Sequence, residues 1–489
     1  MKNKKTFYSI IIGLLFYMLL SWIIVAGNFS NTDYQSVGFN QIGLFDFFLA
    51  PINLFNYYVI SMTKNISGYV NQVGYGNIIF GFVSIGIFYG VLNSTGAYSK
   101  MINDIKNKLE NRKILFTLLI SGFYFVFASL TGLNLVLFFL LPLVNAIMCK
   151  LNIEKKTVFS STVGAMLVGT IVSLFNPTIN GLNRILYMVP LNNNIIPRVI
   201  LFVMFLILYL TFILFTFKDG EEYENILLYE EEIEKKVRGK KKVTTESKSY
   251  LPIIITMSLV FIIVSICMYN WYYMFNNIKV TNSYNNLINT NIKDYTFMKN
   301  ILGMSESFGY WTGFTMGALL ILSSFVLAFL YKIKLDKTLS SMKKGFSDIT
   351  PMLFYSVLSL SIIVLSLYNS NSFVYSLINR LLSIKNQTIG VFTISFLHNI
   401  FVNDYFALAS SLGNVFNKIY GSENLNMTLL LTQLGHGFAS LVTPFNVYLI
   451  AGLTYLNVSY TGWLKHIWKF LLIVIILVII VLVILSAIK

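Results

Sequence analysis

Two short polar motifs that contain proline lie inside long apolar stretches, and their residues are the best placed in the chain to bind a ligand. Residues 173–177 read Ser-Leu-Phe-Asn-Pro, and residues 440–444 read Ser-Leu-Val-Thr-Pro. Proline inside a helix removes a backbone hydrogen bond and exposes carbonyl groups, which a cavity tolerates and lipid does not. Half-helix ends offer free N–H groups to anions and free carbonyls to cations. We predict a binding site where two broken helices meet, with a simple helix kink as the alternative.

Polar residues around the two breaks, and in two further polar turns expected to approach them from opposite sides, are the candidate contacts. The first break offers Ser173, Asn176, Thr178, Asn180 and Arg184. The second offers His436, Ser440, Thr443 and Asn446. The turns, each of which interrupts an apolar stretch, offer Ser129, Thr131, Gly132 and Asn134 in one case and Asn403 and Asp404 in the other.

Three of these candidates are ionisable, and each has two readings. Asp404 is the only acid in its apolar run. Since a charge at membrane depth is costly unless it is paired or used, it could bind a substrate amine, a cation or a proton; the alternative is a tip exposed to water. Arg184 could clamp a carboxylate or snorkel to the membrane interface. His436 could titrate near neutral pH or be a hydrogen-bonded structural residue.

Signals for catalysis, metals and nucleic acid are missing from the sequence. It contains no HExxH, GxSxG or P-loop motif, and Cys149 and Cys267 have no CxxC spacing. The net charge of +16 is spread in short clusters between apolar runs, without an aromatic-interleaved basic domain. We therefore expect no enzyme, no catalytic residue, no metal, no cofactor and no nucleic-acid partner; Na⁺ or H⁺ remains a candidate coupling ion.

The elements that carry the candidate residues must be membrane-spanning helices. Of the 489 residues 56% are apolar and 11% charged, and the mean hydropathy is +0.70. Continuously apolar runs such as 200–217, 251–271 and 470–488 can cross roughly 30 Å of hydrocarbon as helices, whereas a barrel would alternate polar and apolar residues. The run 7–26 is longer than the core of a signal peptide, so we predict an uncleaved first helix with a cytoplasmic N-terminus. The predicted fold class is an all-α polytopic membrane protein.

Positive charges predict the sidedness of the helices, because basic residues stay in the cytoplasm. The basic clusters at 100–113, 235–242 and 332–344 then share that side, with 251–271 and 351–368 crossing outward, while Arg380, Lys385 and Lys418 fall outside. Stretches 114–149 and 387–420 have both ends on one side. They are predicted to be re-entrant hairpins, with two short spanning helices as the alternative. Stretch 45–60 is placed as an interfacial or partly inserted segment.

The two halves of the chain repeat. Asn93-Ser94 and Ile102-Asn103 are matched, at the same spacing, by Asn369-Ser370 and Ile378-Asn379. Each half reads as helix, surface helix, interrupted hairpin, proline-broken helix and final helix, and the charges give the halves opposite orientations. The predicted regions are an N-terminal helix with an interfacial segment at 1–76, a first inverted repeat at 77–217, a charged cytoplasmic linker at 218–250, scaffold helices with an external Asn-rich segment at 251–350, and a second inverted repeat at 351–489.

Several segments resemble a known family. They are 44–47, 90–97, Asn176-Pro177 with Gly181, Pro190-Leu191, 433–438 running to Pro444, and 463–465. Over nearly its whole length the chain resembles the YfcC family, also called the C4-dicarboxylate anaerobic carriers, of the ion transporter superfamily. The resemblance implies an elevator-type fold and a homodimer in which a transport domain moves against a fixed scaffold. The family includes arginine/ornithine exchangers and proteins named for dicarboxylates.

The chain departs from that family's pattern near the candidate site. The family usually has glutamates where Leu133 and Asn134 stand, an aspartate in place of His436, and a Ser-Gly-rich tip in place of 403–405. Fewer acids weaken the case for a dibasic substrate, although Asp404 could replace the lost charge.

The sequence thus predicts a secondary transporter in the bacterial cytoplasmic membrane. It would move a small amino acid or carboxylate by alternating access, through exchange or ion coupling, with arginine/ornithine-type exchange weakly favoured. The alternatives are transport of C4-dicarboxylates or peptide fragments, a channel, and an intramembrane enzyme or non-transport scaffold. Expected partners are the small-molecule substrate, the lipid bilayer and a second copy of the chain.

Overall fold

The structure, a computed structural model, describes residues 4–30, 32–56, 75–192, 194–223, 225–228, 249–276, 278–290, 296–303, 305–367 and 371–487. Three features used in the sequence analysis lie outside these residues: the charge runs at 230–242, the matched pair Asn369-Ser370, and the end of the 45–60 stretch.

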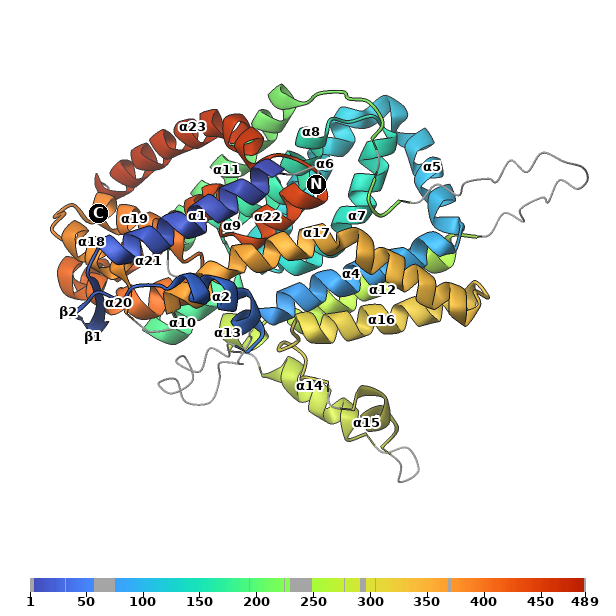
Figure 1. The fold of residues 1–489 in the computed structure, drawn as a ribbon, viewed down its shortest axis with the longest axis horizontal. Helices are drawn as coiled ribbons and strands as arrows, with labels where there is room; N and C mark the ends of the chain where they lie inside the picture. Colours follow the sequence, from blue (N-terminus) through green and yellow to red (C-terminus); the bar gives the residue numbers. More distant parts are fainter. Residues whose placement is uncertain are drawn as a thin grey trace, which may run out of the picture.

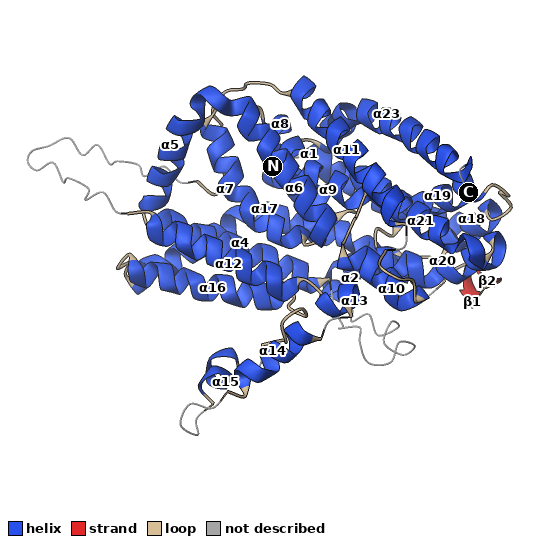
Figure 2. Cartoon of the chain, turned by 180° about the vertical axis from the view of Figure 1, so that it is seen from behind, coloured by secondary structure: helices blue, strands red, loops and turns tan. Residues whose placement is uncertain are grey.

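Most of the described chain is helical (Figure 2). Within the part that the structure describes, nine helical segments are long and apolar enough to cross a membrane: Lys4–Ile23, Gly76–Ser94, Ala97–Thr131, Ile195–Thr216, Leu251–Met268, Gly313–Leu330, Leu335–Ser366, Leu425–Tyr455 and Tyr460–Val478. The prediction of a helical, polytopic membrane protein is confirmed. The antiparallel hairpin of β1 (Ala26–Ser30) and β2 (Asp33–Gly38) was not predicted.

A first group of helices forms a tight bundle in which α4 (Gly76–Ser94) lies between α16 (Gly313–Leu330) and α17 (Leu335–Leu367) (Figure 1). A Cβ atom on Gly345 of α17 would lie 2.1 Å from the carbonyl oxygen of Gly86 in α4. A Cβ atom on Gly90 would lie 2.3 Å from the carbonyl oxygen of Ser341. Small residues are what allow helix backbones to approach this closely in a membrane. The bundle also contains α2 (Leu44–Asn56) and α12 (Leu251–Met268).

Two of these helices differ from their predicted bounds. Helix α17 begins at Leu335, so the basic residues at 337–344 lie on its first turns; the 351–368 prediction took Pro351 as a start, although the helix accommodates it in its interior. Helix α12 ends at Met268, and a separate short helix, α13 (Trp271–Phe275), begins after two intervening residues. After α13 come α14 (Lys279–Ile288) and α15 (Phe297–Leu302), which project from the body as an arm where the Asn-rich segment was predicted (Figure 1).

The chain after α4 carries the first hairpin and the first broken helix. In order it contains α5 (Ala97–Leu109), η1 (Glu110–Arg112), α6 (Lys113–Thr131), α7 (Asn134–Lys150), α8 (Lys155–Phe159), the π-helical turn η2 (Ser160–Gly164), α9 (Ala165–Ile171), the π-helical turn η3 (Pro177–Gly181), α10 (Leu182–Tyr187) and α11 (Ile195–Thr216). The chain reverses at Gly132 between α6 and α7. The helix formed by α8, η2 and α9 stops at Ile171 and resumes at Pro177.

The chain after α17 has the same order of elements. It contains α18 (Phe373–Leu381), α19 (Gln387–Phe401), α20 (Tyr405–Tyr420), η4 (Ser422–Asn424), α21 (Leu425–Val442), α22 (Val447–Tyr455) and α23 (Tyr460–Ala487). A surface helix is followed by a hairpin, a helix broken around Pro444, and a final helix. The opposite orientation of the two series, and the five predicted regions, remain predictions.

Both hairpins and both broken helices form a second body that packs against the bundle. Within it α6 packs on α9, α19 packs on α21, and α21 packs on α9. Helices α22 and α7 contact the bundle through α17 and α4. Within the second body, α22 and α7 are therefore the main elements at the contact with the bundle.

The N-terminal helix α1 (Lys4–Ile23) packs against the C-terminal half of the chain. It contacts α17 and α23, and the Tyr17 hydroxyl lies 3.1 Å from Ser372 Oγ, 355 residues away. Gly27 and Ser372 exchange two backbone hydrogen bonds. Lys418, at the open end of the second hairpin, pairs with Asp33 of β2 at 2.5 Å. These contacts bring 26–38, 372 and 418 close together, and the side of the membrane on which they lie stays a prediction.

Candidate functional site

Both hairpin turns and both helix breaks line one cavity of about 490 Å³, here called the central cavity. Clefts of this size hold small organic ligands. Ten of the residues predicted from the sequence line it: Thr131, Gly132, Asn134, Asn176, Thr178, Asn403, Asp404, His436, Ser440 and Asn446. The other five, Ser129, Ser173, Asn180, Arg184 and Thr443, lie behind its wall or beside it.

The first turn and the first break touch at Gly132. This residue has a φ of +65°, in the left-handed region that favours glycine, and a Cβ atom on it would lie 2.1 Å from Asn176 Oδ1. The Asn176 side chain caps the resumed helix, because Oδ1 accepts hydrogen bonds from the Thr178 backbone N–H at 2.9 Å and from its hydroxyl at 2.6 Å. Asn134, at the start of α7, has a buried Oδ1 without a hydrogen-bond partner among the described residues. Its role as a ligand contact stays a prediction.

Ser129, Ser173 and Asn180 shape the first break from behind. The backbone N–H of Leu174 donates to the Ser129 carbonyl at 2.8 Å, which ties the break to the first turn. Asn176 Nδ2 donates to Ser173 Oγ at 3.0 Å, and Asn180 Nδ2 donates to the Ser173 carbonyl at 2.5 Å. The carbonyl groups that the break exposes are thus partly satisfied by side chains, as a non-helical segment at membrane depth requires.

The second turn and the second break are joined through Asn403. Its Nδ2 donates to Ser440 Oγ at 3.0 Å, and its Oδ1 accepts from Asn446 Nδ2 at 2.8 Å. Asn446 also caps α22, since its Oδ1 accepts from the Leu449 N–H at 2.8 Å. Thr443 points away from the cavity and donates to the Ile400 carbonyl at 2.6 Å. An asparagine therefore caps the resumed half of each broken helix, although the sequence repeat aligns Asn176 with Thr443.

Asp404 supplies the charge of the central cavity. Among the described residues that line it, Asp404 is the only Asp or Glu, and none is Lys or Arg. One carboxylate oxygen caps α20 by accepting from the Ala407 N–H at 2.7 Å, and the other accepts from the Tyr75 hydroxyl at 2.6 Å. Tyr75 lies just before α4 of the bundle, so this hydrogen bond links the bundle to the second hairpin. The cavity therefore has a net negative charge when Asp404 is ionised.

His436 belongs to a polar chain that joins the two halves. Its Nδ1 lies 2.7 Å from Asn399 Oδ1, an arrangement in which the ring nitrogen donates. The imidazole packs edge-on against the Tyr405 ring, with 5.4 Å between the ring centroids. The Tyr405 hydroxyl donates to Asn183 Oδ1 at 2.9 Å, just beyond the first break. The second hairpin tip is therefore bonded to the first broken helix.

Arg184 does not line the central cavity. Its Nε and Nη2 donate to the carbonyl oxygens of Tyr273 and Tyr272 at 2.8 and 3.0 Å. Tyr273 does line the cavity, so the guanidinium positions α13 at the cavity wall.

Several aromatic and polar cavity residues were not predicted. They come from helix ends in the bundle and from α22, and include Tyr75, Asn77, Tyr273, Trp311, Thr312 and Tyr448. The bundle residues lie outside the two repeat motifs, so no repeat signal marked them. An aromatic residue within two positions of a polar one, just before an apolar run, as at 75–77 and 310–312, is the pattern that could have found the bundle residues.

No group of three or more His, Cys, Asp or Glu side chains that could hold a metal ion occurs among the described residues.

Comparison with known proteins gives one match. A family model described as C4-dicarboxylate anaerobic carrier matches residues 4–487, which is almost the entire chain. No curated protein and no solved structure matches the chain.

Proposed function

The chain belongs to the C4-dicarboxylate anaerobic carrier family, and from this premise we propose that it is a secondary transporter of a small amino acid or related carboxylate. The observation that carries the proposal is the convergence of two hairpin turns and two helix breaks on the central cavity. Helix ends and unwound segments at membrane depth are the elements with which carriers bind polar solutes. A multi-pass membrane carrier is the function that the family supports.

The charge of the cavity favours an amino acid over a C4-dicarboxylate. A dicarboxylate dianion would meet the Asp404 carboxylate, and the described residues that line the cavity include no lysine or arginine to offset the repulsion. An amino acid brings an ammonium group that can pair with Asp404. Its carboxylate can approach the helix starts at Asn134 and Asn446, where the partial positive charge of the helix dipole lies. Asp404 can pair with one ammonium group, which favours an amino acid with a single positive charge. Exchange of dibasic amino acids of the arginine/ornithine type is therefore the weaker form of the proposal.

The division into two bodies supports an elevator-type mechanism. The hairpins and broken helices pack mainly on one another, whereas α4, α16 and α17 form a bundle held by close glycine contacts. We propose that the second body, which holds the hairpins and the broken helices, moves as the transport domain and that the bundle is the fixed scaffold. The homodimer implied by the family resemblance, the cytoplasmic N-terminus and the location in a bacterial cytoplasmic membrane belong to the same proposal.

Coupling by exchange or by a Na⁺ or H⁺ gradient is the remaining part of the proposal. Asp404 is the candidate for a cation or proton, and His436 lies on the same wall of the cavity. If Asp404 binds the substrate ammonium, exchange needs no further charged group in the cavity.

Counterflow in proteoliposomes tests the function. The purified protein is loaded with each member of a panel of amino acids, C4-dicarboxylates and dipeptides, with and without a sodium gradient. We expect a neutral amino acid to drive uptake of its own label. Uptake of dicarboxylates only would support the alternative substrate class, and a conductance above carrier turnover rates would show a channel.

A pair of variants tests the location of the site. Asn176→Leu and Asn446→Leu remove the polar side chains that line the cavity at the two breaks, and we expect counterflow to be lost when both are present. Thr211→Val is the matched control, because Thr211 lies exposed on α11 and bonds only to the Ile207 carbonyl. Unchanged counterflow in the double variant would mean that the substrate binds elsewhere.

A further inference from the structure

The chain after α11 runs back along the first hairpin. Residues 217–228, of which Glu224 lies outside the described residues, are here called the strap. The Glu154 N–H donates to the Lys218 carbonyl at 3.0 Å, and the Gly220 N–H donates to the Asn152 carbonyl at 2.7 Å. The strap thereby starts as an antiparallel pair with the loop between α7 and α8, on the predicted cytoplasmic side.

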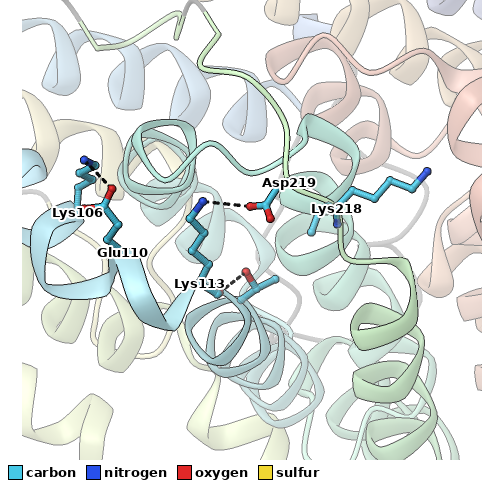
Figure 3. Close-up of polar contacts among 7 residues, drawn as sticks. Lys106, Glu110, Lys113, Lys218 and Asp219 are labelled. Carbon is cyan, nitrogen blue, oxygen red and sulfur yellow. Dashed lines mark hydrogen bonds and ion pairs between the residues drawn. The ribbon is translucent and has the colours of Figure 1, made fainter.

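Two ion pairs attach the strap to both arms of the first hairpin. Lys113, at the start of α6, pairs with Asp219 at 3.1 Å. Figure 3 shows this pair, with the neighbouring Lys218 side chain pointing away from it. Lys150, at the end of α7, pairs with Glu222 at 2.5 Å. Both carboxylates are more than half exposed. Because solvent-exposed ion pairs contribute little to stability, these two pairs orient the strap but do not hold it permanently in place.

Tyr223 covers the end of α7. Its hydroxyl donates to Asn145 Oδ1 at 2.6 Å, and its carbonyl accepts from the Cys149 thiol at 2.9 Å. The Lys155 ammonium lies 4.4 Å from the centre of the ring. Burial raises the pKa of the Tyr223 hydroxyl well above its usual value, so the group remains a donor. Cys149 is only 1% exposed beneath this cover.

The last described part of the strap enters the contact between the two bodies. Leu227 is 1% exposed, and its carbonyl accepts from Asn93 Nδ2 of α4 at 2.7 Å. Its side chain lines a small apolar cavity together with Phe82, Phe138, Met352 and Tyr455, which belong to α4, α7, α17 and α22. Leu227 therefore fills the crevice between the bundle and the first hairpin.

An aromatic layer separates Leu227 from the central cavity. The Phe82 and Phe138 rings, which line the small cavity, lie 5.0 Å apart, and Phe138 lies 5.6 Å from Tyr448, which lines the central cavity. A path from the central cavity to the strap side between α4 and α7 is thus closed first by aromatic rings and then by Leu227.

We propose that the strap is a releasable gate on the predicted cytoplasmic side, with Leu227 as its plug. The strap is bonded to α4 through Asn93 and to the hairpin through Tyr223, so movement of one body past the other must break one of these attachments. Release of Leu227 opens the crevice, and release of Tyr223 uncovers Cys149. This inference rests on the proposed carrier function, since it assigns the strap a role in alternating access.

The chain provides its own reporter for this motion. Cys149 and Cys267 are the only two cysteines, so Cys267→Ser leaves Cys149 as the single thiol. The full-length variant is placed in nanodiscs, which expose both faces, and its reaction with a water-soluble maleimide is followed by mass spectrometry. In this parent we expect slow labelling without substrate. We expect at least about fivefold faster labelling when a transported substrate is present.

Strap variants in the same background test the gate without any substrate. Leu227→Ser removes the plug, and we expect labelling of Cys149 about tenfold faster than in the parent. Glu222→Gln removes the pair with Lys150, and a two- to threefold increase is expected. Glu221→Gln is the matched control, because Glu221 carries the same charge next in sequence but forms no ion pair with any of the described residues. Its labelling rate should equal that of the parent.

Two results would overturn the gate: labelling of Leu227→Ser at the parent rate, or labelling of the parent as fast as in denaturant. Two checks guard against misfolding. Tyr223→Phe keeps the backbone carbonyl that accepts from the Cys149 thiol, so it should label only modestly faster than the parent. Leu227→Ser must elute as a monodisperse peak. The counterflow assay detects a failure of the carrier function independently of the labelling experiment. In that case no compound of the panel gives counterflow, yet the order of the substrate-free labelling rates still supports the strap.

Discussion

Asp404→Asn is the substitution that most directly tests the proposed substrate class. It replaces the only acid among the described residues that line the cavity with a side chain of the same size. Asparagine is as good a helix cap as aspartate, so its amide oxygen can still accept from the Ala407 N–H and hold the start of α20. The change therefore removes the charge and leaves the hairpin tip in place.

The size of the effect follows from the contact that the charge would make. A hydrogen bond to a charged group contributes about 1.5–3 kcal/mol, and every 1.4 kcal/mol corresponds to about tenfold in affinity. Loss of the pair between Asp404 and a substrate ammonium should weaken amino-acid binding by about 10- to 140-fold. Binding of a dicarboxylate should become tighter, because the like-charge repulsion is removed.

The assay is the concentration dependence of counterflow, with direct binding by calorimetry. Tyr75→Phe is the control. It removes only the hydroxyl that donates a hydrogen bond to the Asp404 carboxylate, so the affinity for the amino acid should stay the same or increase. Equal amino-acid affinity in Asp404→Asn and the unsubstituted protein would refute the assignment of Asp404 to the substrate. A change confined to the sodium dependence would assign it to a coupling cation.

Three further substitutions test the architecture of the site. Gly132→Ala would drive a Cβ atom into Asn176, so we expect counterflow to fall at least about tenfold while the protein stays folded; full activity would show that the turn and the break separate in the working protein. Asn403→Ala removes the link between the second turn and the second break and should lower both substrate affinity and melting temperature, and an unchanged melting temperature would contradict the bonded geometry. Gly90→Val places a branched side chain against the carbonyl of Ser341 in the bundle, and its melting temperature should fall by several degrees; a variant as stable as the unsubstituted protein would disprove the close helix contact.

Much of the scaffold of the site could be predicted because it depends on local signals. Pro177 and Pro444 mark helix breaks through backbone chemistry that any sequence displays. The turns at Gly132 and Asn403 interrupt apolar runs that are too short to cross the membrane twice, so hairpins were the natural prediction. The residues at these four places do line one cavity.

Contacts between distant segments could not be predicted from the same signals. Nothing in the sequence around Tyr75 indicates that its hydroxyl bonds to Asp404, 329 residues away. The composition of the sequence predicts a hydrophilic linker that contains most of the strap. Leu227 is buried only because it enters a crevice that forms when the two bodies pack together. Ser129 and Thr443 are polar, like the residues that line the cavity. The backbone geometry nevertheless directs them to backbone amide and carbonyl groups behind the cavity wall.

The packing of α1 against the second half of the chain has a consequence for the order of assembly during translation. Tyr17 meets Ser372 across 355 residues, and the β1–β2 hairpin meets the same segment and Lys418. At a synthesis rate of about 5–20 residues per second, these partners emerge from the ribosome about 20 to 70 s after α1. Helix α1 must therefore remain in the lipid without these protein neighbours until α17 and α18 have been synthesised. It is then one of the last helices to complete its packing contacts.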